Sequence, residues 1–219
     1  MAKWQLINQR ILFGEQSEVK GRDGAVKVIT AHTDPETGDA INTWGVQVVE
    51  KNYVAPSGRE HSQIITSGSG LHSVVVFAVS DDLNVILTRQ FRHGMDAEII
   101  ECPAGLMLDE HKSYEELGIQ EVLEETGFGE PDRITQLAGP LYVSTGKADT
   151  HFVPFLATGL RKVAEQQLGP SEDIQVVVMP LVDWLGMIQR GEVIGASSIT
   201  TTLLALMELK GVELIQLFK

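Results

Sequence analysis

The stretch ECPAGLMLDEHKSYEELGIQEVLEETGF, residues 101–128, constrains the fold more than any other part of the chain. It contains a Pro-Ala-Gly turn, followed by a segment that carries the start and stop signals of a short helix. Ser113 and Glu116 have the spacing of a capping box, and Gly127 stands where helices often end in a left-handed glycine. The sequence therefore predicts a helix from Ser113 to Thr126.

Strand-like segments lie on both sides of this helix. Before it, SVVVFAVS and VILTRQF flank the turn DDLN and predict a hairpin of buried strands. After it come ITQLAGPLYV, THFVPFLAT and IQVVVMPL, and then the helical segments LVDWLGMIQRG and SSITTTLLALMELKG, each ending in glycine. This order predicts an α+β fold, an α/β/α sandwich built around a mixed sheet.

The N-terminal part has a different character. The β-branched segments AVKVITAHT and WGVQVVEKNYV are joined by DPETGD, which is typical of a turn. The polar stretch ITSGSGLH then indicates a domain boundary. We therefore expect a small N-terminal β domain over residues 1–68, followed by a larger domain over residues 69–219.

Charge and composition narrow the range of partners. The net charge is −13, from 30 acidic residues against 17 Lys and Arg, and such a surface repels a nucleic-acid backbone. The single cysteine, Cys102, excludes a disulfide within the chain and is expected to be a small buried apolar side chain. No secretory signal is visible, and the apolar runs are too short to span a membrane. We expect a cytoplasmic protein without nucleic-acid or membrane partners.

The helix predicted above has an acidic face. Glu121 and Glu125 lie one turn apart with Glu124 beside them, and like charges at this spacing destabilise a helix by about 0.2–0.5 kcal/mol per pair. Three apolar residues fall on roughly the opposite face, which would pack on the sheet: Ile119, Val122 and Leu123. The glutamates are either a solvated face of an acidic chain or carboxylates that gather around Mg²⁺ or Mn²⁺. The helix alone does not distinguish the two.

The combined line RQFR…ECPAGL…QEVLEETGF resembles the Nudix hydrolase family, and more narrowly its ADP-ribose pyrophosphatase branch. The family signature is Gly-x5-Glu-x7-Arg-Glu-U-x-Glu-Glu-x-Gly-U, where U is apolar. Gly105 opens it here, and EVLEETGF, from Glu121 to Phe128, matches its second half. The resemblance extends over roughly residues 25–210 and implies the Nudix fold.

Two signature positions depart from the family pattern. Fourteen residues, 106–119, separate Gly105 from Gln120, which is one more than the pattern allows. Lys112 stands at the first glutamate position, although Glu110 could reach it from the longer loop. Gln120 replaces the arginine that orients a neighbouring glutamate in the family; glutamine still donates a hydrogen bond, but without charge assistance. Neither change removes a metal ligand that the resemblance implies.

The resemblance also implies a ligand set and a reaction. Mg²⁺ or Mn²⁺ would be held by the carbonyl of Ala104 and by Glu121, Glu124 and Glu125, the last two also serving catalysis. Such ions bridge two phosphates and lower the pKa of the attacking water. The implied reaction is hydrolysis of the diphosphate bond of ADP-ribose to AMP and ribose 5-phosphate, or of a related nucleoside diphosphate sugar.

Four further residues receive roles by resemblance, each with a simpler alternative. Glu172, or Asp173 beside it, would be the general base, and is otherwise a plain loop acid. Arg92 would bind the substrate phosphates, and is otherwise a solvent-facing strand residue. Glu101 would be a metal or substrate ligand, and is otherwise a structural acid. Trp44 would stack on adenine, and is otherwise a core or interface side chain.

The family enzymes are usually two-fold dimers, which implies a homodimer with exchanged N-terminal domains here. A different class of function is a catalytically weak, Nudix-like sensor that binds a nucleotide sugar. The inserted residue, Lys112 and Gln120 are the features that favour it.

Overall fold

The computed structural model describes residues 5–13, 17–20, 26–29, 31–33, 40–42, 47–68, 72–107, 112–169 and 172–210. Trp44 and Glu110 lie outside these residues. The chain divides into two compact units: Met1–His72 with Tyr142–His151, and Ser73–Leu141 with Phe152–Lys219. The boundary expected at residue 68 stays a prediction.

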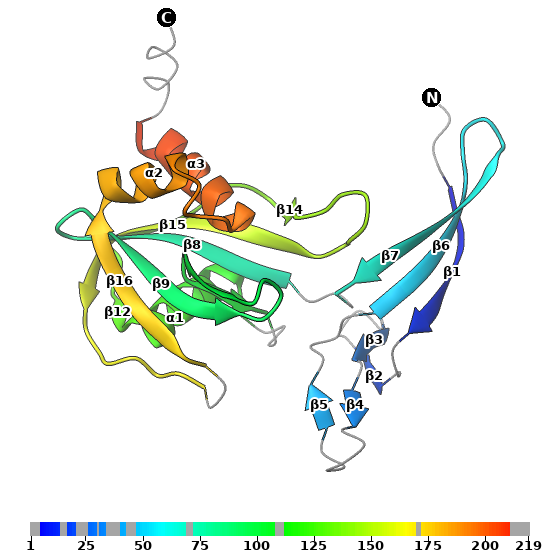
Figure 1. Cartoon of the computed structure of the whole chain (residues 1–219), viewed down its shortest axis with the longest axis horizontal. Coiled ribbons are helices and arrows are strands. Elements are labelled where there is room, and N and C mark those ends of the chain that lie inside the picture. Colours follow the sequence, from blue (N-terminus) through cyan, green and yellow to red (C-terminus); the bar gives the residue numbers. More distant parts are fainter. Residues whose placement is uncertain are drawn as a thin grey trace, which may run out of the picture. The chain divides into compact units, whose positions relative to one another are not determined.

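The first unit contains a small antiparallel sheet, as the sequence predicted. Its strands are ordered β1-β6-β7, and two short hairpins, β2 with β3 and β4 with β5, accompany it (Figure 1). The sequence did not identify β1 or β7 individually, because β7 is mostly polar and exposed on both faces. The bounds are β1 Gln5–Phe13, β2 Ser17–Lys20, β3 Val26–Ile29, β4 Ala31–Thr33, β5 Ala40–Asn42, β6 Gln47–Val54 and β7 Glu60–Ser67.

Residues 142–151 join this first unit although they come late in the chain. The Asp149 carboxylate accepts hydrogen bonds from Ser67 Oγ at 2.8 Å and from the Gly68 N–H at 3.0 Å. Lys51 Nζ lies 3.7 Å from the same carboxylate. One aspartate therefore ties this late loop to the end of β7.

The second unit is built on a sheet with the strand order β10-β9-β8-β15-β12, to which β11, β13 and β14 add short pairings, while β16 pairs with β9 along its full length. Its strands are β8 His72–Ser80, β9 Asn84–Arg92, β10 Ala97–Glu101, β11 Ala104–Leu106, β12 Phe128–Gly129, β13 Arg133–Gln136, β14 Leu141–Tyr142, β15 His151–Lys162 and β16 Ile174–Pro180. Its helices are α1 Tyr114–Thr126, α2 Leu181–Gln189 and α3 Ala196–Lys210. The predicted hairpin of β8 with β9 and the two late helices are confirmed.

Strand β8 divides the core of this unit into two layers, because successive side chains of a strand point to opposite faces. Its odd-numbered residues pack with α2 and α3, and its even-numbered residues pack with α1 (Figure 1). The first cluster includes Val75, Phe77, Val79, Trp184 and Ala205. The second includes Val74, Val76, Ala78, Leu117 and Val122. The predicted α/β/α sandwich is confirmed.

The capping signals of the central helix are also confirmed. Ser113 is the N-cap of α1, its hydroxyl accepts the Glu116 N–H, and the Glu116 carboxylate accepts the Ser113 N–H. Gly127 ends the helix with φ 71°, in the left-handed region that glycine adopts without strain.

The apolar face expected for α1 was only partly right. Val122 is buried in the core, but Ile119 and Leu123 are half-buried. The helix also approaches the sheet closely at Gly118, where an added Cβ would lie 3.2 Å from Val76 Cγ2. The buried residues of α1 are Leu117, Gly118, Val122, Glu125 and Thr126, so the packed face differs from the one that hydrophobicity alone indicated.

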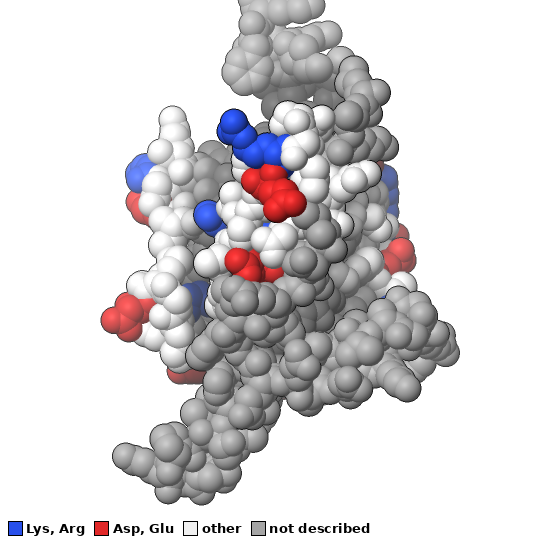
Figure 2. Space-filling model, turned by 90° about the vertical axis from the view of Figure 1, so that its right-hand side faces the viewer, with Lys and Arg blue, Asp and Glu red and all other residues white. Residues whose placement is uncertain are grey.

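Charged side chains of both signs are mixed on one face of the described residues (Figure 2). On the face shown in Figure 2, Asp and Glu side chains lie beside Lys and Arg side chains. Cys102 is buried, as expected. Among the helices of the described residues, none has the length and apolar character needed to cross a membrane.

Candidate active site

The glutamates of α1 meet the Pro-Ala-Gly turn at β11. The Ala104 N–H donates a hydrogen bond to Glu125 Oε2 at 3.1 Å. A Cβ added to Gly105 would lie 1.9 Å from Glu121 Cδ, so this carboxyl group rests directly on the glycine backbone. The structure therefore brings together three of the predicted metal ligands, Ala104, Glu121 and Glu125, and their role as ligands stays a prediction.

Both of these carboxyl groups are hard to ionise. Burial raises the pKa of Glu125 to about 8, with Glu121 and Glu101 adding to the rise, while the Ala104 N–H and Arg92 oppose it. Burial, together with the charges of Glu124 and Glu172, also raises the pKa of Glu121 to about 7, with Lys112 opposing the rise. A cation bound beside two partly buried carboxyl groups would favour their ionised forms and offset the cost of burial and mutual repulsion.

Lys112 and Gln120, the two residues that depart from the signature, are hydrogen-bonded to each other. Gln120 Nε2 donates a hydrogen bond to Glu124 Oε1 at 2.7 Å. The Lys112 ammonium donates to Gln120 Oε1. Gln120 thus orients a glutamate, which is the role expected for a residue at the arginine position.

Arg92 and Glu101 form an ion pair at the edge of the same cluster. Arg92 Nε donates to Glu101 Oε1 at 2.6 Å, and the Glu101 carboxyl is buried. Arg92 is half-exposed, and its charge opposes the rise in the pKa of Glu125, so it lies within electrostatic range of that carboxyl group. Whether either residue touches substrate or metal stays a prediction.

Glu172 lies in the loop before β16. It is exposed, and its Oε2 accepts the Gly169 N–H at 2.7 Å. Its charge adds to the rise in the pKa of Glu121, and its role as the general base stays a prediction. Asp173 is exposed beside it.

The sequence missed two residues that hold the site together. Gln166 Nε2 donates to the carbonyl oxygens of Glu125, at 2.6 Å, and Ile174, at 2.9 Å. Lys162 Nζ donates to the Thr126 carbonyl at 2.9 Å. Both satisfy carbonyls that the last turn of a helix leaves without partners. Nothing in the polar loop sequence KVAEQQLG distinguishes them from surface residues.

The donor set suits Mg²⁺ or Mn²⁺ in its chemistry. It consists of carboxylate and carbonyl oxygens, which these hard cations prefer. Among the described residues, no three acidic, His or Cys side chains converge closely enough to hold an ion as they stand. Two of the carboxylates accept hydrogen bonds from the protein instead, Glu124 from Gln120 Nε2 and Glu125 from the Ala104 N–H.

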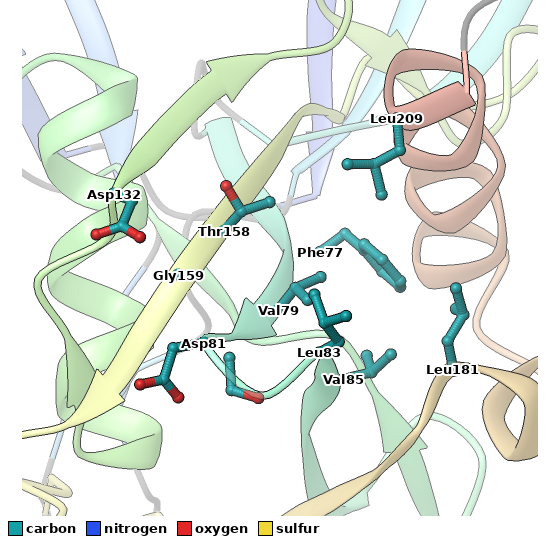
Figure 3. Close-up of a pocket in the computed structure, with 11 residues that line it drawn as sticks. Phe77, Val79, Asp81, Leu83, Val85, Asp132, Thr158, Gly159, Leu181 and Leu209 are labelled. Atoms are coloured by element: carbon teal, nitrogen blue, oxygen red, sulfur yellow. The ribbon is translucent and has the colours of Figure 1, made fainter.

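A pocket of about 420 Å³ lies elsewhere in the second unit. Phe77, Val85 and Leu181 point into it on one side, and Asp81 and Asp132 lie on the other (Figure 3). None of the candidate site residues lines it. Its mostly apolar wall offers little for a diphosphate, so we assign the chemistry to the glutamates of α1.

Comparison with curated proteins finds relatives of one kind. The chain is 31% identical over 144 residues to the ADP-ribose pyrophosphatase of Bacillus subtilis (strain 168), covering 65% of this chain and 75% of that protein. It is 31% identical over 133 residues to the ADP-ribose pyrophosphatase of Saccharomyces cerevisiae, covering 56% and 55%. The Mycobacterium tuberculosis ADP-ribose pyrophosphatase is 26% identical over 132 residues, covering 60% and 63%.

Comparison with solved structures agrees. A crystal structure of an ADP compounds hydrolase matches with a TM-score of 0.70 and 18% identity, covering 95% of each chain, which supports the fold. No protein-family model matches the chain. On the sequence relationship, the shared fold and the acidic helix at the Pro-Ala-Gly turn, the chain belongs to the Nudix hydrolase family, in its ADP-ribose pyrophosphatase branch, and is an enzyme of that family.

Proposed function

We propose that this enzyme hydrolyses the diphosphate bond of ADP-ribose to AMP and ribose 5-phosphate, with Mg²⁺ or Mn²⁺ bound by Ala104, Glu121, Glu124 and Glu125. The observation that carries the proposal is the acidic pair Glu121 and Glu125, crowded against the Pro-Ala-Gly turn with raised pKa values. The names of the relatives support ADP-ribose as substrate. A related nucleoside diphosphate sugar would require the same chemistry.

The residues of this chain would share the work as follows. When bound, the cation would neutralise the two phosphates and ease deprotonation of the attacking water. Arg92 uses Nε on Glu101, and its two terminal nitrogens would donate to a phosphate in the bidentate way that arginine favours. Glu172 would accept the proton of the attacking water. Trp44 would stack on adenine.

A hydrolysis panel tests the substrate and the metal site. The protein is incubated with Mg²⁺ and ADP-ribose, UDP-sugars, GDP-sugars or dinucleotides, and phosphate is measured after phosphatase coupling. We expect turnover of ADP-ribose, reduced about 100-fold or more in Glu125→Gln, because a bound cation contributes several kcal/mol to such a reaction. Glu115→Gln, an exposed glutamate on the same helix, is the matched control and should keep full activity.

Other outcomes would change the proposal in defined ways. Tight binding of ADP-ribose without turnover would support the sensor and contradict hydrolysis. A preference for a UDP- or GDP-sugar would replace the substrate and keep the site. Loss of activity in Glu115→Gln equal to that in Glu125→Gln would show that any charge change on α1 matters, and would remove the argument for a metal at Glu125.

The general base needs its own pair of variants. Glu172→Gln should lower kcat by roughly 10²–10⁴-fold, because that is the usual contribution of general-base catalysis. Asp173→Asn should leave kcat near the parent value. The reverse pattern would move the role to Asp173, and unchanged kcat in both would remove the base from this loop.

We also propose that the protein is cytoplasmic, that it has no nucleic-acid partner, and that it forms a homodimer with exchanged N-terminal domains. The acidic net charge of −13 supports the second of these.

A further inference from the structure

Lys112 and Gln120, which depart from the family signature, form one chain of hydrogen bonds that ends on Glu124. The Lys112 ammonium donates to Gln120 Oε1, and Gln120 Nε2 donates to Glu124 Oε1 at 2.7 Å. The two positions are eight residues apart in sequence. One side chain of the acidic cluster is therefore connected to a surface cation through a single amide.

The order of donors in this chain has a physical consequence. An ammonium group can only donate, so it selects the oxygen end of the glutamine amide. The NH₂ end is then directed at Glu124, where it meets an acceptor. Among the described residues, Lys112 is the one donor to the Gln120 amide oxygen, so its loss would allow the amide to rotate by half a turn and set its oxygen against the carboxylate. Lys112 thus fixes which end of Gln120 faces Glu124.

Lys112 fits with Gln120 but not with the signature arginine, and Gln120 fits with Lys112 but not with the signature glutamate. An arginine at position 120 would stand beside Lys112 and be repelled by it. A glutamate at position 112 would compete with Glu124 for the NH₂ end of Gln120. Gln120 donates to Glu124 and accepts from Lys112, and a signature arginine and glutamate at these two positions would allow the same division, with the arginine as donor to both carboxylates.

We propose that Lys112 is a positioning residue that acts through Gln120 to orient Glu124, and that Lys112 and Gln120 replace the signature Glu and Arg as a unit. The inference rests on the proposed function for its role in cation binding. The geometry of the chain of hydrogen bonds does not depend on that function. Because Lys112 is exposed, we expect its effect to be on orientation, with little change in stability.

A set of variants tests the unit in two ways. The set consists of Lys112→Met, Lys112→Arg, Lys112→Glu, Gln120→Arg and the double variant Lys112→Glu with Gln120→Arg. The first measurement is the NMR signal of the Gln120 side-chain amide in metal-free protein. The second is Mn²⁺ affinity, by titration followed by electron paramagnetic resonance. Arg133→Met is the matched control, because it also removes an exposed cation from an ion pair, here with Glu208.

We expect Lys112→Met to shift the Gln120 amide signal and to weaken Mn²⁺ binding roughly threefold to tenfold, the effect of losing one hydrogen bond of ordinary net strength. Lys112→Arg should retain the parent behaviour. Each of Lys112→Glu and Gln120→Arg should weaken Mn²⁺ binding, and the double variant should recover it. Arg133→Met should change neither measurement.

Two results would overturn the inference. One is a Gln120 amide signal that is unchanged in Lys112→Met. The other is a double variant whose loss of Mn²⁺ binding free energy equals the sum of the losses in the two single variants, without recovery. If the parent bound no Mn²⁺ and did not hydrolyse ADP-ribose, the proposed function would fail, and the metal-free NMR measurement would still decide whether Lys112 orients Gln120.

Discussion

Glu125 is the residue at which burial and charge conflict most directly. Its pKa is raised from an ordinary value of 4.5 to about 8, first by burial. Between these two pH values the folded protein holds a proton that the unfolded chain has released. The stability that this group contributes is therefore complete below pH 4.5 and is lost as pH rises through about 8.

Replacing Glu125 with Gln should remove this pH dependence in the metal-free protein. Glutamine keeps an acceptor for the Ala104 N–H but cannot ionise. In EDTA, we expect the variant to gain stability over the parent by on the order of 2 kcal/mol near pH 8, and to differ little near pH 5. Denaturant unfolding at several pH values measures it.

The matched control is again Glu115→Gln, whose pH profile should follow the parent. Parallel profiles for Glu125→Gln and the parent would contradict the raised pKa. Added Mg²⁺ should stabilise the parent near pH 8 more than Glu125→Gln, because only the parent offers the carboxylate.

At the level of elements, the close approach of β11 to α1 is what confines the acidic pair. Gly105→Ala would put a Cβ 1.9 Å from Glu121 Cδ, so the Glu121 side chain must move. Because that side chain is flexible, we expect little change in the free energy of unfolding. Activity should fall about 100-fold, as displacements near 1 Å in an active site commonly cause.

Gly94→Ala is the control for this variant, because an added Cβ there meets no atom within 4 Å. Steady-state hydrolysis and denaturant unfolding would be measured on both. A Gly105→Ala protein with parent activity would mean that Glu121 works from another position, and the ligand set would need revision.

The joint between α1 and β16 depends on one half-buried glutamine. Gln166→Ala removes the donor shared by the carbonyls of Glu125 and Ile174, and should cost about 1–3 kcal/mol, the range for buried groups left without a partner. Gln136→Ala, which removes an exposed bond to the Ala138 carbonyl, should cost less. Urea unfolding compares the two variants. Equal losses in the free energy of unfolding would contradict a special role of Gln166 in holding α1 to β16.

For the whole molecule, the expectation to test is an exchanged dimer. If Trp44 of one protomer completes the site of the other, then Glu125→Gln and Trp44→Ala proteins should each be weak alone. Co-expressed with different tags, they should regain activity in the mixed dimer, because one of its sites has both intact residues. Hydrolysis by the doubly purified mixture measures this.

Light scattering on a sizing column provides the parallel control, with a dimer expected at twice the 24.0 kDa of one chain. A monomer of full activity would exclude a shared site. A dimer without recovery in the mixture would place Trp44 in the site of its own protomer, or outside the site.

Local patterns were enough for several features. The capping box at Ser113, the glycine end at Gly127, the β8–β9 hairpin and the Pro-Ala-Gly line that indicates the family were all visible in the chain, because each depends on residues a few positions apart. Burial of Cys102 also followed from its type.

Contacts between distant segments decided the rest. Three features depend on which surfaces meet in the folded chain. They are the close approach of α1 to the sheet at Gly118, the raised pKa values of Glu121 and Glu125, and the hydrogen bond from Gln166 to the Glu125 carbonyl. Lys112 and Gln120 were two separate departures in the linear signature, and only the structure shows that their side chains are hydrogen-bonded to each other. The physical reason is that caps and periodicity act through neighbouring backbone groups, whereas desolvation and charge act through space.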